Sequence, residues 1–348
     1  MDNYINIVGF QLEKVHTGVI KWCLDSKASP SNEQIKIIQS LYEHLKKPIP
    51  FAIDSITKIH CTPEYSFGRS VRIDLLIEIY VENSVYRLAC EMKVDSDPYE
   101  KQLDSIVEQV DGESVDSSKN DYLLILIGSA AVMRNVGDQH AKFTVLTNTD
   151  LIRIFSEYNN ESYILQDWLS ALREEQQRGE RVLEQFKLLC ASNKVWDKLA
   201  HIELGYRPFF STYYYLYNII RTHSAMAGDW NIYSGGNNPV MNLSTNWKKI
   251  CDFEFYWEFN YLEFCLKVRI DPDVTARERL NTLRTELYPV LESIEVDGFR
   301  SQMRYGKWNT IYKWDFSNSI QTPDLIIQRV ENDILPSYEN LLTVAKNV

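Results

Sequence analysis

The chain has 348 residues, enough for two domains or for one large domain with an appendage. Hydrophobic residues make up 45% and charged residues 24%, which supports a packed core and argues against wholesale disorder. The formal net charge is -11, which argues against non-specific coating of nucleic acid but leaves room for a local basic patch.

The first half of the chain alternates between helical and strand patterns. Apolar residues at helical spacing predict helices, and short apolar runs between turn residues predict strands. In chain order we expect helices over residues 10–25 and 33–46, strands over 52–62, 71–81 and 85–94, a helix over 98–110, strands over 122–127 and 143–146, and a helix over 148–158. This order predicts an α/β fold with a mixed central sheet and helices on both of its faces.

The second half begins with a long, charged, amphipathic helix expected over residues 164–193. This helix is either a linker between domains or a surface helix within one domain. The remaining residues are rich in aromatic side chains, and we expect antiparallel strands over 252–270 and 298–316 with helices over 273–294 and 323–342. The predicted division is a first domain over 1–165, a linking helix over 166–195 and an α+β domain over 196–348 that recognises a substrate or a partner.

Cysteine usage and the N-terminal residues indicate a cytoplasmic protein. The six cysteines include no CxxC pair, so we expect reduced, buried thiols and no zinc site. The first 14 residues lack the basic and then apolar pattern of a signal peptide. No stretch approaches the roughly 18 uninterrupted apolar residues of a membrane span.

Three charged residues stand in or beside apolar runs that should form buried strands. Glu91 and Lys93 share one face of their strand, and a hairpin with the preceding strand places Asp74 opposite them. Two carboxylates supply the hard oxygen ligands that Mg²⁺ prefers, and a neighbouring lysine can orient a water or stabilise negative charge. The alternative is that Glu91 and Lys93 form a surface ion pair on an edge strand and that solvent reaches Asp74.

The same residues resemble the motif of the PD-(D/E)XK nuclease superfamily. Asp74 is followed by Glu91-Met92-Lys93 on the next strand, and then by a helix that carries Tyr99 and Gln102. Residues 12–25 are similar to the opening helix of a bacterial subgroup, in which a Glu and a His-Ser/Thr pair precede a leucine-rich ending. The resemblance covers roughly the first 150 residues and departs from the motif at Ile73, where the family's name places proline.

This resemblance implies a restriction-endonuclease-like fold and a role for each matching residue. Asp74 and Glu91 become metal ligands, Lys93 the catalytic lysine, and Glu13 the helix-borne acid that completes the metal site or holds a water. Gln102 becomes a residue that supports the site or positions the substrate. The implied cofactor is Mg²⁺, with Mn²⁺ as a substitute.

Two further features carry open alternatives. His16 either helps to orient Glu13 or a phosphate, or is simply hydrogen-bonded in place. A segment near the C-terminus either binds nucleic acid through its cations and exposed aromatics, or contributes aromatics to the core and cations to the solvent. Its candidate nucleic-acid-binding residues are Arg304, Lys307, Trp308 and Lys313.

Together these features predict a Mg²⁺-dependent endonuclease that hydrolyses phosphodiester bonds in DNA. A homodimer is expected because cutting both strands needs two sites, and the C-terminal domain is a candidate for binding a protein partner. The resemblance also implies a role in bacterial defence. The alternatives are an RNA nuclease of the same fold and a non-catalytic acidic binding protein on a nuclease-like scaffold, which the net charge of -11 would suit.

Overall fold

The computed structural model describes residues 3–67, 71–134, 140–158, 162–191, 206–234, 238–317 and 322–348. Residue contacts divide the chain into two compact units, residues 1–131 with 137–180 and residues 132–136 with 181–348. Each unit has its own sheet. Among the described residues, no helix has the length and apolar character needed to cross a membrane.

Among the described residues, the sheet of the first unit has five strands in the order β1-β2-β3-β4-β5. The β1-β2 and β2-β3 pairs are antiparallel, and the β3-β4 and β4-β5 pairs are parallel, so the predicted mixed sheet is confirmed. The strands are β1 (Ile56–Phe67), β2 (Val71–Val81), β3 (Ser84–Val94), β4 (Asn120–Ile127) and β5 (Phe143–Thr147). β4 is buried along its whole length because it lies between two parallel neighbours under helices.

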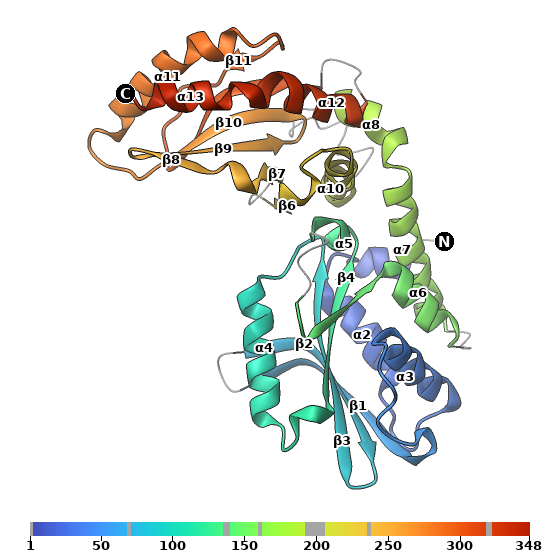
Figure 1. Cartoon of the computed structure of the whole chain (residues 1–348). Helices are drawn as coiled ribbons and strands as arrows, with labels where there is room; N and C mark the ends of the chain where they lie inside the picture. The colour runs from blue at the N-terminus through green and yellow to red at the C-terminus, as the bar shows by residue number, and fades with distance from the viewer. Residues whose placement is uncertain are drawn as a thin grey trace. The chain divides into compact units, whose positions relative to one another are not determined.

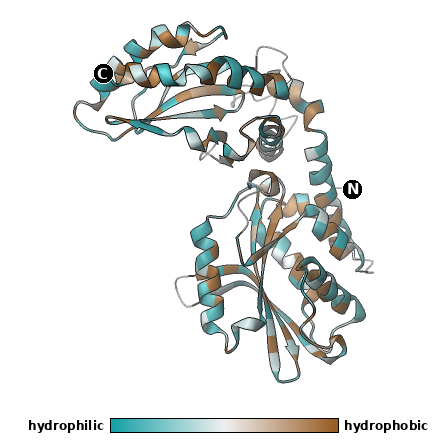
Figure 2. Cartoon of the chain, in the orientation of Figure 1, coloured by the Kyte–Doolittle hydropathy of each residue, from teal (hydrophilic) through white to brown (hydrophobic). Residues whose placement is uncertain are grey.

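Helices cover both faces of this sheet (Figure 1). One face packs against α4, and the other against α2, α3, α6 and α7. In Figure 2 the strands are largely hydrophobic, whereas the solvent side of α4 is hydrophilic. The helices are α1 (Tyr4–Val8), α2 (Glu13–Leu24), α3 (Asn32–His44), α4 (Glu100–Glu113), α6 (Asn148–Ser156) and α7 (Tyr163–Glu180), with the short α5 (Ala130–Met133) after β4.

The second unit is the predicted α+β arrangement, with an antiparallel sheet in the order β11-β12-β10-β9-β7-β6 and β8 paired to β9. Its strands are β6 (Trp230–Ser234), β7 (Pro239–Leu243), β8 (Lys248–Ile250), β9 (Phe253–Asn260), β10 (Glu263–Ile270), β11 (Phe299–Arg300) and β12 (Trp308–Asp315). Its helices are α8 (Val182–Ala191), α10 (Tyr206–Thr222), α11 (Ala276–Glu292), α12 (Pro323–Arg329) and α13 (Tyr338–Ala345). α11, α12 and α13 lie over one face of the sheet (Figure 1).

Two predicted helices are interrupted. The helix expected over 164–193 is two helices, α7 in the core of the first unit and α8 in the core of the second. Residues 192–205, which include the end of the expected linking helix, lie outside the described residues. The helix expected over 323–342 contains a π-turn over Val330–Ile334 and a 3-10 turn over Leu335–Ser337, where Pro336 cannot donate a backbone hydrogen bond.

Gly298 provides a test of packing in the second unit. A Cβ at this position would lie 2.4 Å from Cε1 of Tyr312 and 2.8 Å from Nε1 of Trp314. We expect Gly298→Ala to lower the free energy of unfolding by about 1–3 kcal/mol, because those rings are packed in the core and must shift. Gly306→Ala is the control, since a Cβ there would approach its nearest neighbour no closer than 4.0 Å, and denaturant unfolding followed by tryptophan fluorescence measures both. Equal stabilities would contradict this packing.

Candidate active site

Glu91 is a buried carboxylate in the central strand of the first sheet. β3 lies between β2 and β4, and Glu91 is only 1% exposed. It shares the strand face of Ala89, which packs in the core beneath α4. An ionised carboxylate at such a position is unfavourable unless charged or hydrogen-bonding groups surround it. The neighbouring side chains supply such groups.

The β2-β3 hairpin brings Asp74 to this place. The paired residues run from Val81–Ser84 at the turn to Leu75–Cys90, as counting back from the turn predicted. Beyond that last pair, the Asp74 carboxylate accepts a hydrogen bond of 2.7 Å from the backbone N–H of Met92. The side chain thus takes the place of a ladder bond and fixes Asp74 beside the Glu91–Lys93 segment.

Lys93 is the cation at the centre of the cluster. Its Nζ lies 2.6 Å from Glu91 Oε1, 3.5 Å from Glu13 Oε1 and 3.8 Å from Asp74 Oδ2. It also donates a 2.8 Å hydrogen bond to the carbonyl of Met92. The two nearest groups are Glu91 and Met92 O, so Lys93 turns back on its own strand. This placement excludes a surface ion pair on an edge strand.

Two helices contribute the remaining predicted residues. Gln102, in the first turn of α4, donates a 2.6 Å hydrogen bond from Nε2 to Glu91 Oε1. Glu13 is the first residue of α2, and its Oε1 lies 3.5 Å from Lys93 Nζ. Glu13 is the most exposed of the three acids, at 36%. All five residues predicted as catalytic therefore meet at one place.

The pKa shifts in the cluster indicate an excess of negative charge around Lys93. Burial, and then the negative charge of Asp74, raise the pKa of Glu91 to about 7, against the opposing effect of Lys93. Burial likewise raises the pKa of Glu13. Burial alone would lower the pKa of Lys93, but the surrounding carboxylates outweigh it and raise that pKa. The single positive charge of Lys93 therefore does not balance the three carboxylates around it.

The donor set fits a divalent cation of the Mg²⁺ class. Carboxylate oxygens are hard ligands, and Glu91 Oε2 is a buried oxygen without a hydrogen-bond partner in the described part of the chain. Within the described residues, no group of three or more acidic, histidine or cysteine side chains is already arranged to hold a metal ion. In this arrangement the Lys93 ammonium, rather than a metal ion, lies among the three acids.

Some hydrogen bonds at the site could not be predicted from the residue pattern of the sequence. The backbone of Met92 both donates to Asp74 and accepts from Lys93, and a backbone group carries no residue-type pattern. Asp95, two residues beyond Lys93, accepts hydrogen bonds of 2.9 and 2.8 Å from the N–H and hydroxyl of Ser129. These bonds hold the end of β3 against the segment that follows β4.

The predicted nucleic-acid-binding residues lie in the second unit. Trp308 is 50% exposed, and the Arg269 guanidinium lies over its ring at 5.5 Å. Arg304 and Lys307 are exposed, and neither forms an ion pair with another described residue. Lys313 differs from them, because its Nζ pairs with Glu263 Oε2 at 2.6 Å.

Comparison with known proteins gives one match. The family model described as the PD-(D/E)XK nuclease superfamily matches residues 2–188. The matched region contains every residue of the Asp74–Glu91–Lys93 cluster and both helices that reach it. The searches of curated proteins and of solved structures returned no match.

Replacing Lys93 tests whether the acids need a cation. We expect Lys93→Met to lower the free energy of unfolding in EDTA by about 1–3 kcal/mol, because Glu91 loses its buried partner and must take up a proton. Mg²⁺ or Mn²⁺ should then raise the melting temperature of the variant more than that of the wild type, since metal binding adds stability.

Lys119→Met is the control for Lys93→Met, because the 3.8 Å pair of Lys119 with Asp116 lies near the surface and away from the cluster. Thermal melts with EDTA and with each metal provide the comparison. An unchanged melting temperature for Lys93→Met in EDTA would contradict the buried pairing. An equal metal-induced shift in the two variants would contradict the shortage of positive charge.

Proposed function

The chain belongs to the PD-(D/E)XK nuclease superfamily, and we propose that it is a Mg²⁺-dependent endonuclease that hydrolyses phosphodiester bonds in DNA. The observation that supports the proposal most is that the carboxylates of Glu13, Asp74 and Glu91 all lie within 3.8 Å of the Lys93 ammonium. These residues come from one helix and two strands, and a surface ion pair requires no such assembly.

In the proposed mechanism, Asp74, Glu91 and Glu13 would hold a divalent cation. Such a cation would supply positive charge to offset that of the phosphate and would make a water more acidic. Without it the net negative cluster would repel the phosphodiester. Lys93 orients the attacking water or stabilises the charge that develops on the phosphoryl oxygens. Gln102 keeps Glu91 in place through its hydrogen bond to Oε1.

The proposed setting is a reducing cytoplasm. The cysteines are free, and five of the six are buried. Burial raises the pKa of the Cys23 thiol to about 12, which keeps it protonated and unreactive. Cutting both strands of a duplex at one position requires two sites, so the proposal includes a homodimer on duplex DNA. A role in defence rests only on the likeness of the N-terminal helix to that of a bacterial subgroup.

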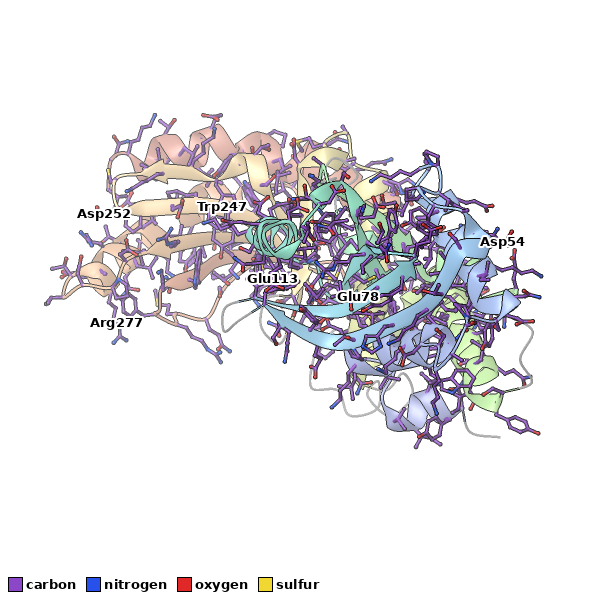
Figure 3. All side chains as sticks on the ribbon, turned by 90° about the horizontal axis from the view of Figure 1, so that it is seen from below. Asp54, Glu78, Glu113, Trp247, Asp252 and Arg277 are labelled. Atoms are coloured by element: carbon purple, nitrogen blue, oxygen red, sulfur yellow. The ribbon has the colours of Figure 1, made fainter. Side chains whose placement is uncertain are left out.

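Asp74→Asn tests the catalytic cluster with little change of shape. The amide oxygen can still accept the hydrogen bond from Met92, but the negative charge is lost. We expect cleavage to fall at least about 100-fold with an unchanged melting profile. Glu78→Gln on the same strand is the control (Glu78 is labelled in Figure 3), since its carboxylate contacts Arg87 and Tyr80 instead of the cluster. It should cleave as the wild type does.

The same cleavage assay identifies the class of nucleic acid that the protein cuts. Duplex DNA, single-stranded DNA and RNA are each incubated with the wild type in Mg²⁺, Mn²⁺ or EDTA. The proposal expects metal-dependent cleavage of DNA. Cleavage of RNA alone would favour the RNA nuclease, and cleavage that persists in Asp74→Asn would contradict the mechanism. A wild type that binds no Mn²⁺ and cuts none of the three would favour the non-catalytic binding protein.

We further propose that the second unit binds nucleic acid near Trp308. The exposed half of this ring can stack on an unpaired base, and Arg304 and Lys307 are cations available to phosphates. Trp247, which is labelled in Figure 3, and Tyr256 support the ring, since Trp308 packs edge-on against both. Lys313 has a weaker case than it had from the sequence, because Glu263 already neutralises it.

Binding without cleavage tests this surface. In EDTA, Trp308→Ala should weaken binding to labelled single-stranded DNA by about 5- to 100-fold, the range expected for one lost base stack. The double variant Arg304→Gln, Lys307→Gln should instead reduce the salt dependence of binding, because it removes phosphate contacts. Fluorescence anisotropy at several salt concentrations measures both effects. Arg329→Gln, which breaks a 3.9 Å surface pair with Asp333, is the control, and an equal loss of affinity there would contradict the proposal.

A further inference from the structure

The start of α2 fixes the position of Glu13, and that start has little support of its own. Glu13 is the first helical residue, and the preceding residue, Leu12, provides no side-chain hydrogen bond to cap the helix. Capping of this kind is the usual way in which the first turn is held. The placement of the Glu13 carboxylate therefore depends on other contacts near the beginning of the helix.

His16, one turn beyond Glu13, makes those contacts. It is fully buried, and the Trp168 indole N–H donates a 3.0 Å hydrogen bond to its Nδ1. An indole nitrogen can only donate, so Nδ1 is unprotonated and Nε2 carries the hydrogen. Nε2 then donates a 2.6 Å hydrogen bond to the carbonyl of Phe10, three residues before Glu13. One neutral tautomer of His16 thus links Trp168 to the chain that leads into α2.

Trp168 is a rigid support for this link. It lies in the second turn of α7, is fully buried, and packs edge-on against Phe155 at 5.2 Å between ring centroids. Phe10 packs edge-on against the His16 ring at 4.9 Å. The path from the core of the first unit to Glu13 therefore runs from α7 through Trp168, His16 and Phe10.

We propose that His16, held between Trp168 and Phe10, is a positioning residue that sets the Glu13 carboxylate toward Lys93. This inference rests on the proposed function, because it concerns the geometry of the same acidic cluster. Burial and the engagement of both ring nitrogens keep His16 away from any substrate. The effect on the reaction must therefore pass through Glu13, whose carboxylate lies 3.5 Å from Lys93 Nζ.

A double-mutant cycle with Glu13 tests the inference. Trp168→Phe removes the indole N–H and keeps an aromatic ring in the core. We expect it to reduce the turnover rate about tenfold and to weaken Mn²⁺ binding severalfold. In a Glu13→Ala background the same change should have almost no further effect on either quantity, because the group that it positions is already absent. Electron paramagnetic resonance of free Mn²⁺ measures binding independently of cleavage.

Two further variants separate positioning from folding. Ile38→Val removes a methyl group from the same hydrophobic core at a residue outside the Trp168–His16–Phe10 path, so it should lower the melting temperature and leave turnover unchanged. His16→Gln retains an amide donor that can reach Phe10, so it should keep more activity than His16→Leu. The ¹⁵N spectrum of labelled histidine should show an unprotonated Nδ1 in the wild type and a shifted Nδ1 resonance in Trp168→Phe.

The outcomes are distinct. Equal losses from Trp168→Phe in the wild-type and Glu13→Ala backgrounds would overturn the positioning role, and so would full Mn²⁺ affinity and turnover in a variant whose Nδ1 resonance has shifted. Wild-type protein that cleaves no nucleic acid would overturn the proposed function alone, because the Mn²⁺ cycle still reports whether Trp168 acts through Glu13.

Discussion

The buried carboxylate of Glu91 is the constraint on which the first unit depends. A carboxylate that is 1% exposed in a central strand needs charge and hydrogen bonds around it, and each neighbouring element provides part of them. β3 itself supplies Lys93, and α4 supplies Gln102 from its first turn. β2 adds a second acid, Asp74, so the arrangement offsets the burial of one charge while bringing further negative charge close. The cluster thus holds more negative charge than the pairing of Glu91 alone would require.

The cluster has more carboxylates than cations, so its charges do not divide into one-to-one ion pairs. A structural pair would match one acid with one base, whereas Lys93 faces Glu13, Asp74 and Glu91 together. The pKa of Glu91, raised to about 7 by burial and by Asp74, shows that the lysine does not fully compensate. Strongly shifted groups that meet in this way are typical of functional sites, although structural networks can also produce them. Glu91 Oε2, which has no hydrogen-bond partner among the described residues, favours the functional interpretation.

The sequence predicted the parts of the structure that depend on short-range patterns. Strand β4 follows from an uninterrupted apolar run, and the placement of Asp74 follows from counting back through the β2-β3 turn. Glu13 was found only through the resemblance, because no spacing rule connects a helix start with a strand 80 residues away. The role of His16 was left open for the same reason, since its partner Trp168 is 152 residues away. Long-range side-chain pairs require the fold itself.

Under the proposed function, the two units of this acidic protein would recognise an anionic polymer in different ways. In the second unit several cations on the sheet are paired, as Lys267 is with Glu258 and Arg269 with Glu254, so they add little long-range attraction. A net charge of -11 also weakens non-specific binding. Under the proposed function, affinity then comes from short-range contacts, with bases stacking on Trp308, and from a cation held in the Glu91 cluster. A protein of this kind would discriminate by local structure of its substrate more than by total charge, because stacking needs an unpaired base and the cation needs a phosphate within direct reach.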